Sequence, residues 1–360
     1  MKKMMMGLAG ALSLLTPAPS AQAAESLQTF ELDEIVVVAH RDNTDTAETS
    51  VNVKELIDAG QIKTAADILA NVPGVVVTKG QNNGIQVGLW GLNHERTVIA
   101  INGNVVQDVG EIGMGGRAME WDALPVTGIK KIELIRGTSA RYGGAVGGVI
   151  NIVTDDASGP GTKTTLRQSV GSWHTYKTTV IHQGATDDQR FSWNINASWA
   201  KSGGYYRNNE SNGHDFHFDT TYKLNEQDRL NLSYSHIYKK EGIIVGNNKN
   251  GSPASRYLGY DSSYPVTPNA PQNWVDGYRQ WKTDNIALNY TTPTASVGIF
   301  NYRQGRREYV NRVVTPMGIL RLLGMQEYWN SDIQNYGIDW RQTSRAGVLT
   351  LRYGIQYGKT

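Results

Sequence analysis

Apolar and polar residues alternate through much of the second half of the chain. In Arg190–Ala200, large or apolar side chains occupy every second position from Phe191 to Trp199, and small polar residues stand between them. The same alternation returns at 230–238, 285–290 and 349–357. Strict alternation places the two sets of side chains on opposite faces of an extended strand. The pattern predicts about nine strands between Thr162 and Thr360.

The connections between these segments alternate in length. Short connections are expected near 184–189, 225–228, 292–293 and 344–347, and long polar ones near 203–214, 240–280 and 305–330. Tyrosine and tryptophan gather at the segment ends. Strands of about ten residues with aromatic ends, one polar face and this asymmetry of loops are typical of an antiparallel transmembrane β-barrel. A secreted β-sandwich, which would also alternate, is the other architecture considered.

The preceding residues follow a different pattern. Thr64–Ala70 predicts a short helix that opens with a capping box and ends at the Val72-Pro73-Gly74 stop. Asn102-Gly103 predicts a hairpin turn. Further short strands are expected at Val75–Thr78, Gln86–Trp90, Thr97–Ile101 and Ile129–Ile135. These elements indicate a compact α+β domain over 51–155 with its own core.

The glycine-rich segment Arg136–Thr154 is the first candidate for a binding loop. A phosphate-binding loop requires a helix directly after its glycines, whereas here the β-branched run Val149–Thr154 follows. Nucleotide binding is therefore disfavoured. Glycine is also needed where φ is positive or where another backbone approaches closely, and this second role is the one we expect.

The first 23 residues have the composition of a secretory signal peptide. Lys2 and Lys3 precede an apolar core from Met4 to Leu15, and Ala21-Gln22-Ala23 fits a cleavage site. A retained membrane anchor is the alternative. No later run of about 18 apolar residues is present, so no transmembrane helix is expected in the mature chain. Residues 24–50 are predicted to form a periplasmic N-terminal segment, and 160–360 the barrel portion.

Charge and composition exclude several classes of function. The formal net charge of +2 at pH 7 includes the two lysines of the signal peptide, so the mature chain is close to neutral. A neutral chain does not attract nucleic acid, which is therefore not an expected partner. The absence of cysteine excludes disulfides and thiolate chemistry. The spacing of His214 and His217 puts them on opposite faces of a strand, and no metal site or cofactor is expected. A secreted hydrolase lacks support because no nucleophile elbow, HExxH motif or acid pair occurs, so no catalytic residue is assigned.

Four motifs resemble one family. "TAADILANVPGVVV", "ERTVIAINGNVV", "LPVTGIKKIELIRGTSARYGGAVGGVINIVT" and the early "DEIVVVA" are similar, in that order and spacing, to the plug domain and TonB box of TonB-dependent outer-membrane receptors. The resemblance is strong from Asp33 to Thr154, and it rests on pattern alone through the barrel. It implies localisation in the Gram-negative outer membrane, contact with outer-membrane lipid, and a function in transport rather than catalysis.

The resemblance also implies roles for particular residues. The TonB box would comprise Asp33, Glu34, Ile35, Val36, Val37, Val38 and Ala39, which would bind the periplasmic energy transducer TonB by strand addition. A first strand of the fold is the alternative for this segment. The plug lock would comprise Arg136, Gly137, Arg141, Tyr142 and Gly143. The chain departs from the family at Trp90, where these receptors usually carry an arginine.

The ligand is expected to be a scarce nutrient, most simply a ferric siderophore. The candidate contacts are Gln81, Asn82 and Asn83 in the plug and the cations Arg306 and Arg307, which suit an anionic ferric chelate. Haem and cobalamin remain alternatives. His94 is a minor candidate for a ligand contact.

Length limits the barrel. Barrels that hold a plug have about 22 strands, and too few residues follow Thr154 to form them. We therefore expect an incomplete barrel, from the N-terminal part of a transporter. The alternative is a truncated fragment that does not transport and whose plug only binds TonB.

Overall fold

The computed structural model describes residues 38–40, 48–52, 65–70, 72–79, 85–92, 96–106, 121, 129–136, 142, 147–154, 161–249, 259–267, 274–314, 323–347 and 349–359. The first part of this range forms an α+β domain. Its elements are β1 (Val38–His40), β2 (Glu48–Asn52), α2 (Ala65–Leu69), β3 (Val75–Lys79), β4 (Ile85–Leu89), β5 (Val98–Ile101), β6 (Asn104–Val106), β7 (Ile129–Ile135) and β8 (Val149–Thr154).

Six of these strands form one sheet in the order β1-β2-β7-β8-β5-β6. The β5–β8 pair is parallel, and the other pairs are antiparallel. Strands β3 and β4 form a separate hairpin. The predicted helix and strands are present, and no bound differs from the expected one by more than one residue.

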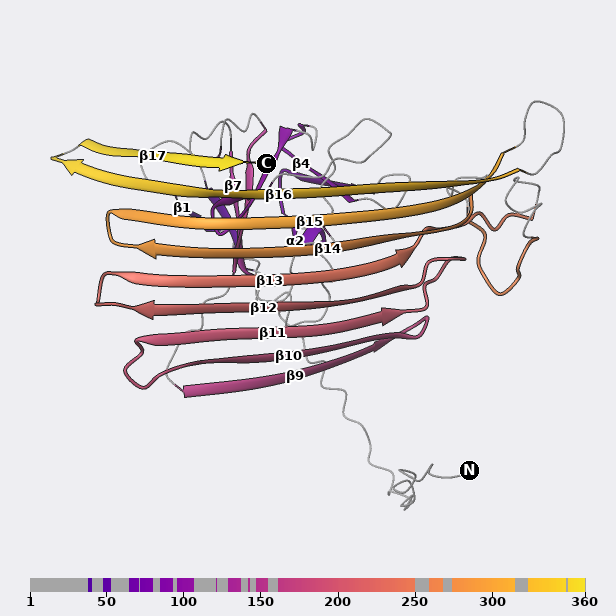
Figure 1. Cartoon of the computed structure of the whole chain (residues 1–360), viewed down its shortest axis with the longest axis horizontal. Coiled ribbons are helices and arrows are strands. Elements are labelled where there is room, and N and C mark those ends of the chain that lie inside the picture. Colours follow the sequence, from indigo (N-terminus) through magenta and orange to yellow (C-terminus); the bar gives the residue numbers. More distant parts are fainter. Residues whose placement is uncertain are drawn as a thin grey trace, which may run out of the picture. The chain divides into compact units, whose positions relative to one another are not determined.

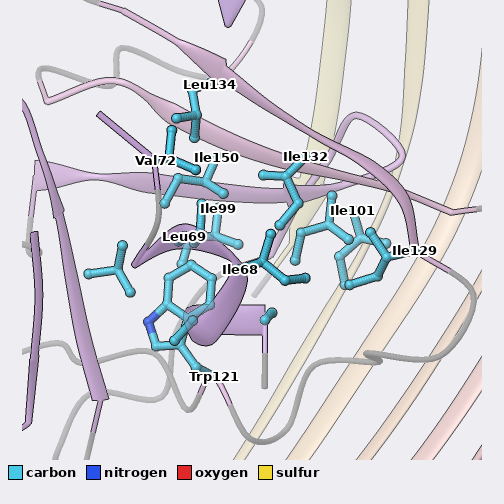
Figure 2. Packing of buried hydrophobic residues seen from close by; sticks show 14 of the residues in the cluster. Ile68, Leu69, Val72, Ile99, Ile101, Trp121, Ile129, Ile132, Leu134 and Ile150 are labelled. Carbon is cyan, nitrogen blue, oxygen red and sulfur yellow. The ribbon is translucent and has the colours of Figure 1, made fainter. Parts of the chain in front are cut away.

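The core of the α+β domain lies between α2 and the six-stranded sheet. Figure 2 shows Ile68 and Leu69 of α2 facing Ile99 and Ile101 of β5, Ile132 of β7 and the buried Trp121. All of these side chains are less than a tenth exposed. Burying one such aliphatic side chain contributes about 1.5–3 kcal/mol, so this cluster stabilises a domain with only one short described helix.

The Asn102-Gly103 hairpin connects β5 to β6 as predicted. Ile101 pairs with Asn104 across a two-residue turn in which φ is 51° at Asn102 and 82° at Gly103. Positive φ at both central positions defines a type I′ turn, which matches the twist of the flanking strands. Asn-Gly is the residue pair that adopts this geometry most readily.

The glycines before β8 are required by close backbone approach. Gly148 has φ of 104°, and a Cβ there would lie 2.7 Å from the Ile135 carbonyl oxygen. A Cβ at Gly147 would lie 2.7 Å from the Arg96 carbonyl oxygen. The expected role in packing is thus confirmed at these two positions. Residues 137–141 and 143–146 of the same segment lie outside the described residues.

The remainder of the chain forms a nine-stranded antiparallel sheet, the number of strands predicted from the alternation. Its strands are β9 (Gly161–Gly171), β10 (Thr175–Ala185), β11 (Phe191–Ser202), β12 (Ser211–Lys223), β13 (Arg229–Gly242), β14 (Trp274–Thr291), β15 (Ala295–Val314), β16 (Leu323–Ala346) and β17 (Leu349–Lys359). Each strand pairs with its neighbours in sequence, as Figure 1 shows. Among the described residues the sheet is open, with β9 and β17 at its edges.

One predicted loop is largely wrong. The segment 305–330 was expected to connect two strands, but β15 continues to Val314 and β16 begins at Leu323, with a continuous ladder up to the Val314–Leu323 pair. Arg303, Arg306 and Arg307 therefore lie within a strand. Their polarity suggested a loop, but β15 carries charged side chains on both faces, with Arg306 buried on one face and Arg303 exposed on the other.

The short connections are closed by side chains that bond to nearby backbone. In the β10–β11 turn, the Thr186 hydroxyl donates to Asp188 Oδ1 at 2.6 Å, and the Arg190 N–H donates to the same oxygen at 3.1 Å. These hydrogen bonds hold the pKa of Asp188 below its usual value.

In the described part of the chain, no helix has the length and apolar character needed to cross a bilayer.

Candidate functional site

The two faces of the nine-stranded sheet differ in chemistry. One face carries buried polar residues, among them Asn196, His217, Ser235, Thr283 and Asn335. The opposite face carries exposed apolar residues, including Leu166, Trp199, Ile286, Ile299, Ile338 and Ile355. We call these faces the inner wall and the outer wall. A polar inner wall and an apolar outer wall are the arrangement of a transmembrane barrel.

The inner wall has a buried charge cluster on β14 and β15. Glu308 Oε2 accepts a hydrogen bond from Arg306 Nη2 at 2.7 Å and from Arg279 Nε at 3.2 Å. The exposed fraction of the side chain is 5% for Arg306, 2% for Arg279 and 7% for Glu308. Two guanidinium groups thus share one carboxylate, and the three side chains together carry one net positive charge.

A second feature lies in the α+β domain, where an aromatic ring carries a cation. The Arg136 guanidinium carbon lies 3.9 Å from the centroid of the Trp90 ring. Trp90 follows β4 with φ of 57°, and its backbone N–H donates to the Gly74 carbonyl oxygen at 2.7 Å. A cation stacked on an indole ring gains about 0.5–1 kcal/mol at an exposed site. No described carboxylate lies within ion-pair distance of Arg136.

A polar network joins the α+β domain to β16 of the sheet. The Gly103 N–H donates to Asn151 Oδ1 at 2.9 Å, and Asn151 Nδ2 donates to Glu133 Oε2 at 2.8 Å. On the other side of the same turn, Arg341 Nη2 donates to the Gly103 carbonyl oxygen at 3.0 Å. Tyr302 of β15 also belongs to the hydrophobic core of the α+β domain. The Arg341–Gly103 hydrogen bond and the packing of Tyr302 thus connect the α+β domain to the inner wall of the sheet.

The matching family explains this combination of domains. Residues 41–149 match the TonB-dependent Receptor Plug Domain. Residues 41–149 therefore form a plug domain of the kind found in TonB-dependent receptors. The α+β domain is this plug, and the nine-stranded sheet that follows has the fold of an unclosed part of a receptor barrel.

Several relatives match part of this chain. The chain is 40% identical over 111 residues to a vitamin B12 transporter of Photobacterium profundum, an alignment that covers 30% of this chain and 18% of the relative. It is 32% identical over 177 residues to the ferrienterobactin receptor of Escherichia coli, covering 44% of this chain and 22% of that receptor. The chain thus spans about a fifth of the length of these relatives.

Solved structures share the fold of both parts. The ferripyoverdine receptor of Pseudomonas aeruginosa aligns with 90% of this chain and 43% of its own length, with a TM-score of 0.69 and 13% identity. The ferric yersiniabactin uptake receptor of Yersinia pestis aligns with 88% of this chain and 48% of its own, with a TM-score of 0.61 and 18% identity. At these identities the likeness concerns the fold.

The predicted TonB box lies partly within the described residues. Val38 and Ala39 belong to β1, which pairs antiparallel with β2 at the edge of the plug sheet. Asp33, Glu34, Ile35, Val36 and Val37 lie outside the described residues. The last two residues of the segment are thus part of a strand of the fold, which was the alternative considered for the segment. One edge of β1 has no strand beside it in the described part of the plug.

The predicted plug lock is only partly described. Arg136 is exposed and stacks on Trp90, and Tyr142 is buried with Ala100, Ile135 and Val149. Gly137, Arg141 and Gly143 lie outside the described residues. The departure at Trp90 was visible in the sequence, but its contact with Arg136 was not, because the two residues are far apart in the chain and only the fold brings them together.

The predicted ligand contacts do not form one cluster. Arg306 is buried on the inner wall, whereas Arg307 lies on the outer wall and pairs with Asp332, Nη2 to Oδ2, at 2.9 Å. Adjacent residues of a strand must point to opposite faces. Gln81, Asn82 and Asn83 lie outside the described residues, as does His94. The sequence reasoning missed Arg279, although its place in the alternation puts it on the polar face.

The two histidines of β12 lie on opposite faces, as expected. His217 is 2% exposed on the inner wall, and the exposed His214 stacks on His236 and Tyr238 of β13. Their rings are therefore separated by the sheet. Within the described residues, no group of three or more potential metal ligands occurs.

Proposed function

We propose that the chain provides the plug and the first barrel strands of a transporter that carries a ferric siderophore across the outer membrane, driven by TonB. The observation that carries this proposal is the sequence of domains: a plug that matches the family is followed by a sheet with a polar inner wall and an apolar outer wall. The plug would move when an occupied receptor engages TonB.

The charge of the inner wall supports an anionic ligand. Arg279 and Arg306 share Glu308, so these three side chains contribute one positive charge to a buried polar surface. A ferric chelate that carries negative charge would gain charge-assisted hydrogen bonds at such a surface. The relative that aligns over 177 residues is a ferrienterobactin receptor, which agrees with this ligand class.

Cobalamin is the second candidate ligand. Two relatives are vitamin B12 transporters, at 40% and 33% identity. These alignments cover 111 and 162 residues, which are 18% and 25% of the two relatives. A match over so small a share of a relative supports the family's transport mechanism more than it supports a particular ligand.

The partner TonB would bind the segment Asp33–Ala39. An extended peptide joins a partner by main-chain hydrogen bonds with little demand on its side chains. The run of β-branched residues Ile35–Val38 suits an extended conformation. Because β1 already holds Val38 and Ala39 at a sheet edge, TonB would either pair with its open edge or displace it from β2.

A proline substitution tests this function. Val37→Pro removes one backbone N–H and disfavours strand pairing, so energised uptake is expected to fall to background while ligand binding stays unchanged. Val37→Thr is the matched control, because it keeps the β-branched side chain and the N–H. Cells that produce the chain in its native context are assayed for uptake of an iron-loaded catecholate siderophore and, in parallel, of cyanocobalamin.

The outcomes separate the candidates. Uptake of the iron chelate that proline abolishes and threonine preserves supports the proposal. The same result with cyanocobalamin alone would replace the ligand and keep the mechanism. Unchanged uptake in the proline variant contradicts the TonB assignment. A chain that binds TonB but takes up neither compound would establish the alternative of a fragment that does not transport.

A further inference from the structure

Three tyrosines form a row across β14, β15 and β16 on the outer wall. Tyr278 pairs with Tyr309, and Tyr309 pairs with Tyr328, at directly opposite positions of the two ladders. Their ring centroids lie 5.6 Å apart in the first pair and 4.8 Å apart in the second. Directly opposite side chains on one face of an antiparallel pair are held in contact by the register. We call these three residues the tyrosine row.

The tyrosine row lies near the end of the sheet that carries the long connections. At that end β13 stops at Gly242 and β14 begins at Trp274, whereas at the opposite end residues 292–294 join β14 to β15. Aromatic residues line the two interfaces of transmembrane barrels, and the longer connections lie on the side that faces the outside of the cell. Tyr328 is 64% exposed at this place. A small oxidant that arrives from outside the cell thus reaches the row.

Tyrosine is the residue at which oxidation can link two strands of this chain. The chain has 18 tyrosines and no cysteine, so a disulfide is excluded. Removal of one electron and one proton from a phenol gives a radical that is shared with the ring carbons ortho to the oxygen, and two such radicals bond where their rings are in contact. Tyr205 and Tyr206 are another close pair, at 4.8 Å, but they are sequence neighbours, so a bond between them joins no two strands.

Within the tyrosine row, the pair Tyr309–Tyr328 is favoured over the pair Tyr278–Tyr309. The rings of Tyr309 and Tyr328 are the closer ones, at 4.8 Å against 5.6 Å. In addition, Lys240 Nζ lies 4.1 Å from the centroid of the Tyr278 ring. A cation over an aromatic face is attracted by the electrons of the ring, so it makes the loss of an electron from Tyr278 less favourable. Oxidation is therefore directed to Tyr309 and Tyr328.

We propose that Tyr309 and Tyr328 are a site of oxidative modification, at which a dityrosine bond links β15 to β16. Each phenol gives one hydrogen atom to a hydroxyl radical, formed when ferrous iron reduces hydrogen peroxide, and each hydroxyl radical becomes water. The two phenoxyl radicals then form one carbon–carbon bond between ortho carbons, and the hydrogen of each of these carbons moves as a proton to the phenolic oxygen. The pair thus loses two hydrogen atoms. Like a disulfide, the bond closes a loop of the chain and stabilises the fold by restricting the unfolded state.

Oxidation of the full chain in its membrane tests this proposal. Membranes from cells that produce the chain are treated with hydrogen peroxide and a ferrous salt, and the chain is then purified and digested with trypsin. Cleavage after arginine separates residues 308–312, which contain Tyr309, from residues 322–341, which contain Tyr328 and Tyr336. A linked peptide is expected with the summed mass of these two peptides less two hydrogen atoms, and its fragment ions should place the bond at Tyr309 and Tyr328.

Two variants separate this pair from the other tyrosines. Tyr328→Phe keeps the ring but removes the phenol, so the linked peptide is expected to be lost. Tyr290→Phe is the matched control, because Tyr290 is also exposed on the outer wall, while the residues opposite it are Leu230 and Val297. The yield of the linked peptide should be unchanged in this variant.

Several outcomes would overturn the proposal. They are the absence of the linked peptide from the oxidised unaltered chain, an undiminished yield in Tyr328→Phe, which would place the bond at Tyr336, and an equal loss in Tyr290→Phe. A linked peptide that occurs only in a dimer on a denaturing gel would also overturn it, since the bond would then join two copies of the chain. The readout involves neither ligand uptake nor TonB, so failure here leaves the transport proposal intact.

Discussion

Trp90 contacts two residues that are distant from it in sequence. Its ring carries the Arg136 guanidinium on one side, and its backbone N–H bonds to Gly74. A Cβ at Gly74 would lie 2.3 Å from the Trp90 ring, so glycine is required there for space as well as for its φ of 83°. The arginine expected in the family at Trp90 is thus replaced by a ring that receives a cation instead of repelling it.

Gly74→Ala is expected to loosen the β3–β4 hairpin more than Gly91→Ala. Gly91 has φ of 77°, and a Cβ there would meet no heavy atom within 4 Å, so alanine costs only the left-handed backbone, about 1–2 kcal/mol. Gly74→Ala adds the clash with Trp90, about 1–3 kcal/mol more. Native-state hydrogen exchange of β3 and β4 amides in the full chain measures both opening free energies.

A double-mutant cycle assigns the difference to the ring. In a Trp90→Ala background the clash disappears, so Gly74→Ala should then cost about as much as Gly91→Ala. An unchanged difference between the two glycine variants in that background would show that the ring is not responsible.

The β5–β6 hairpin is the element that joins the plug to the inner wall. Its turn donates to Asn151 through the Gly103 N–H and accepts from Arg341 through the Gly103 carbonyl. Because both contacts use backbone atoms of one residue, the conformation of the turn sets their geometry. A type I′ turn presents these two groups on opposite sides, where β8 and β16 supply the partners.

Asn151→Leu is expected to destabilise this hairpin. The buried Gly103 N–H would lose its acceptor, which costs about 1–3 kcal/mol, so its exchange should accelerate by about tenfold or more. Glu133→Leu is the control, because Asn151 Oδ1 still accepts from Gly103 while the contact with Glu133 is lost. Equal acceleration in both variants would place the stabilisation in the Glu133 contact instead.

The two walls of the sheet decide how the whole molecule meets its surroundings. Ile299 is 52% exposed among apolar residues of the outer wall, and Tyr328 is 64% exposed on the same wall, where it pairs with Tyr309. Ile299 and Tyr328 are both largely exposed but lie at different depths in the membrane. Comparing substitutions at the two positions therefore separates the effect of membrane depth from the effect of exposure.

Ile299→Lys is expected to cost more stability in the membrane than Tyr328→Lys, up to about 2 kcal/mol against about 0–1 kcal/mol. The physical reason is that a cation among apolar side chains that face lipid loses its hydration, whereas one at the interface retains it. The fraction of the chain that resists urea extraction from membranes measures the difference. Equal extraction of the two variants would contradict the assignment of the outer wall to lipid.

Local patterns in the sequence were sufficient for the elements and their faces. Alternation predicted nine strands and their two faces because a strand exposes its side chains with a period of two, and Asn102-Gly103 predicted its turn because few residue pairs accept positive φ twice. Loop bounds at 305–330 were wrong, since polarity alone does not distinguish a loop from a strand with a polar face.

Contacts between distant residues were decided by the tertiary structure alone. Stacking of Arg136 on Trp90, the sharing of Glu308 by Arg279 and Arg306, and the bond from Arg341 to Gly103 each depend on strand order and register. A local pattern states which face a side chain takes, but not which neighbour lies beside it. Pairing of strands in space supplies that neighbour, and with it the charge and packing on which the proposed functions depend.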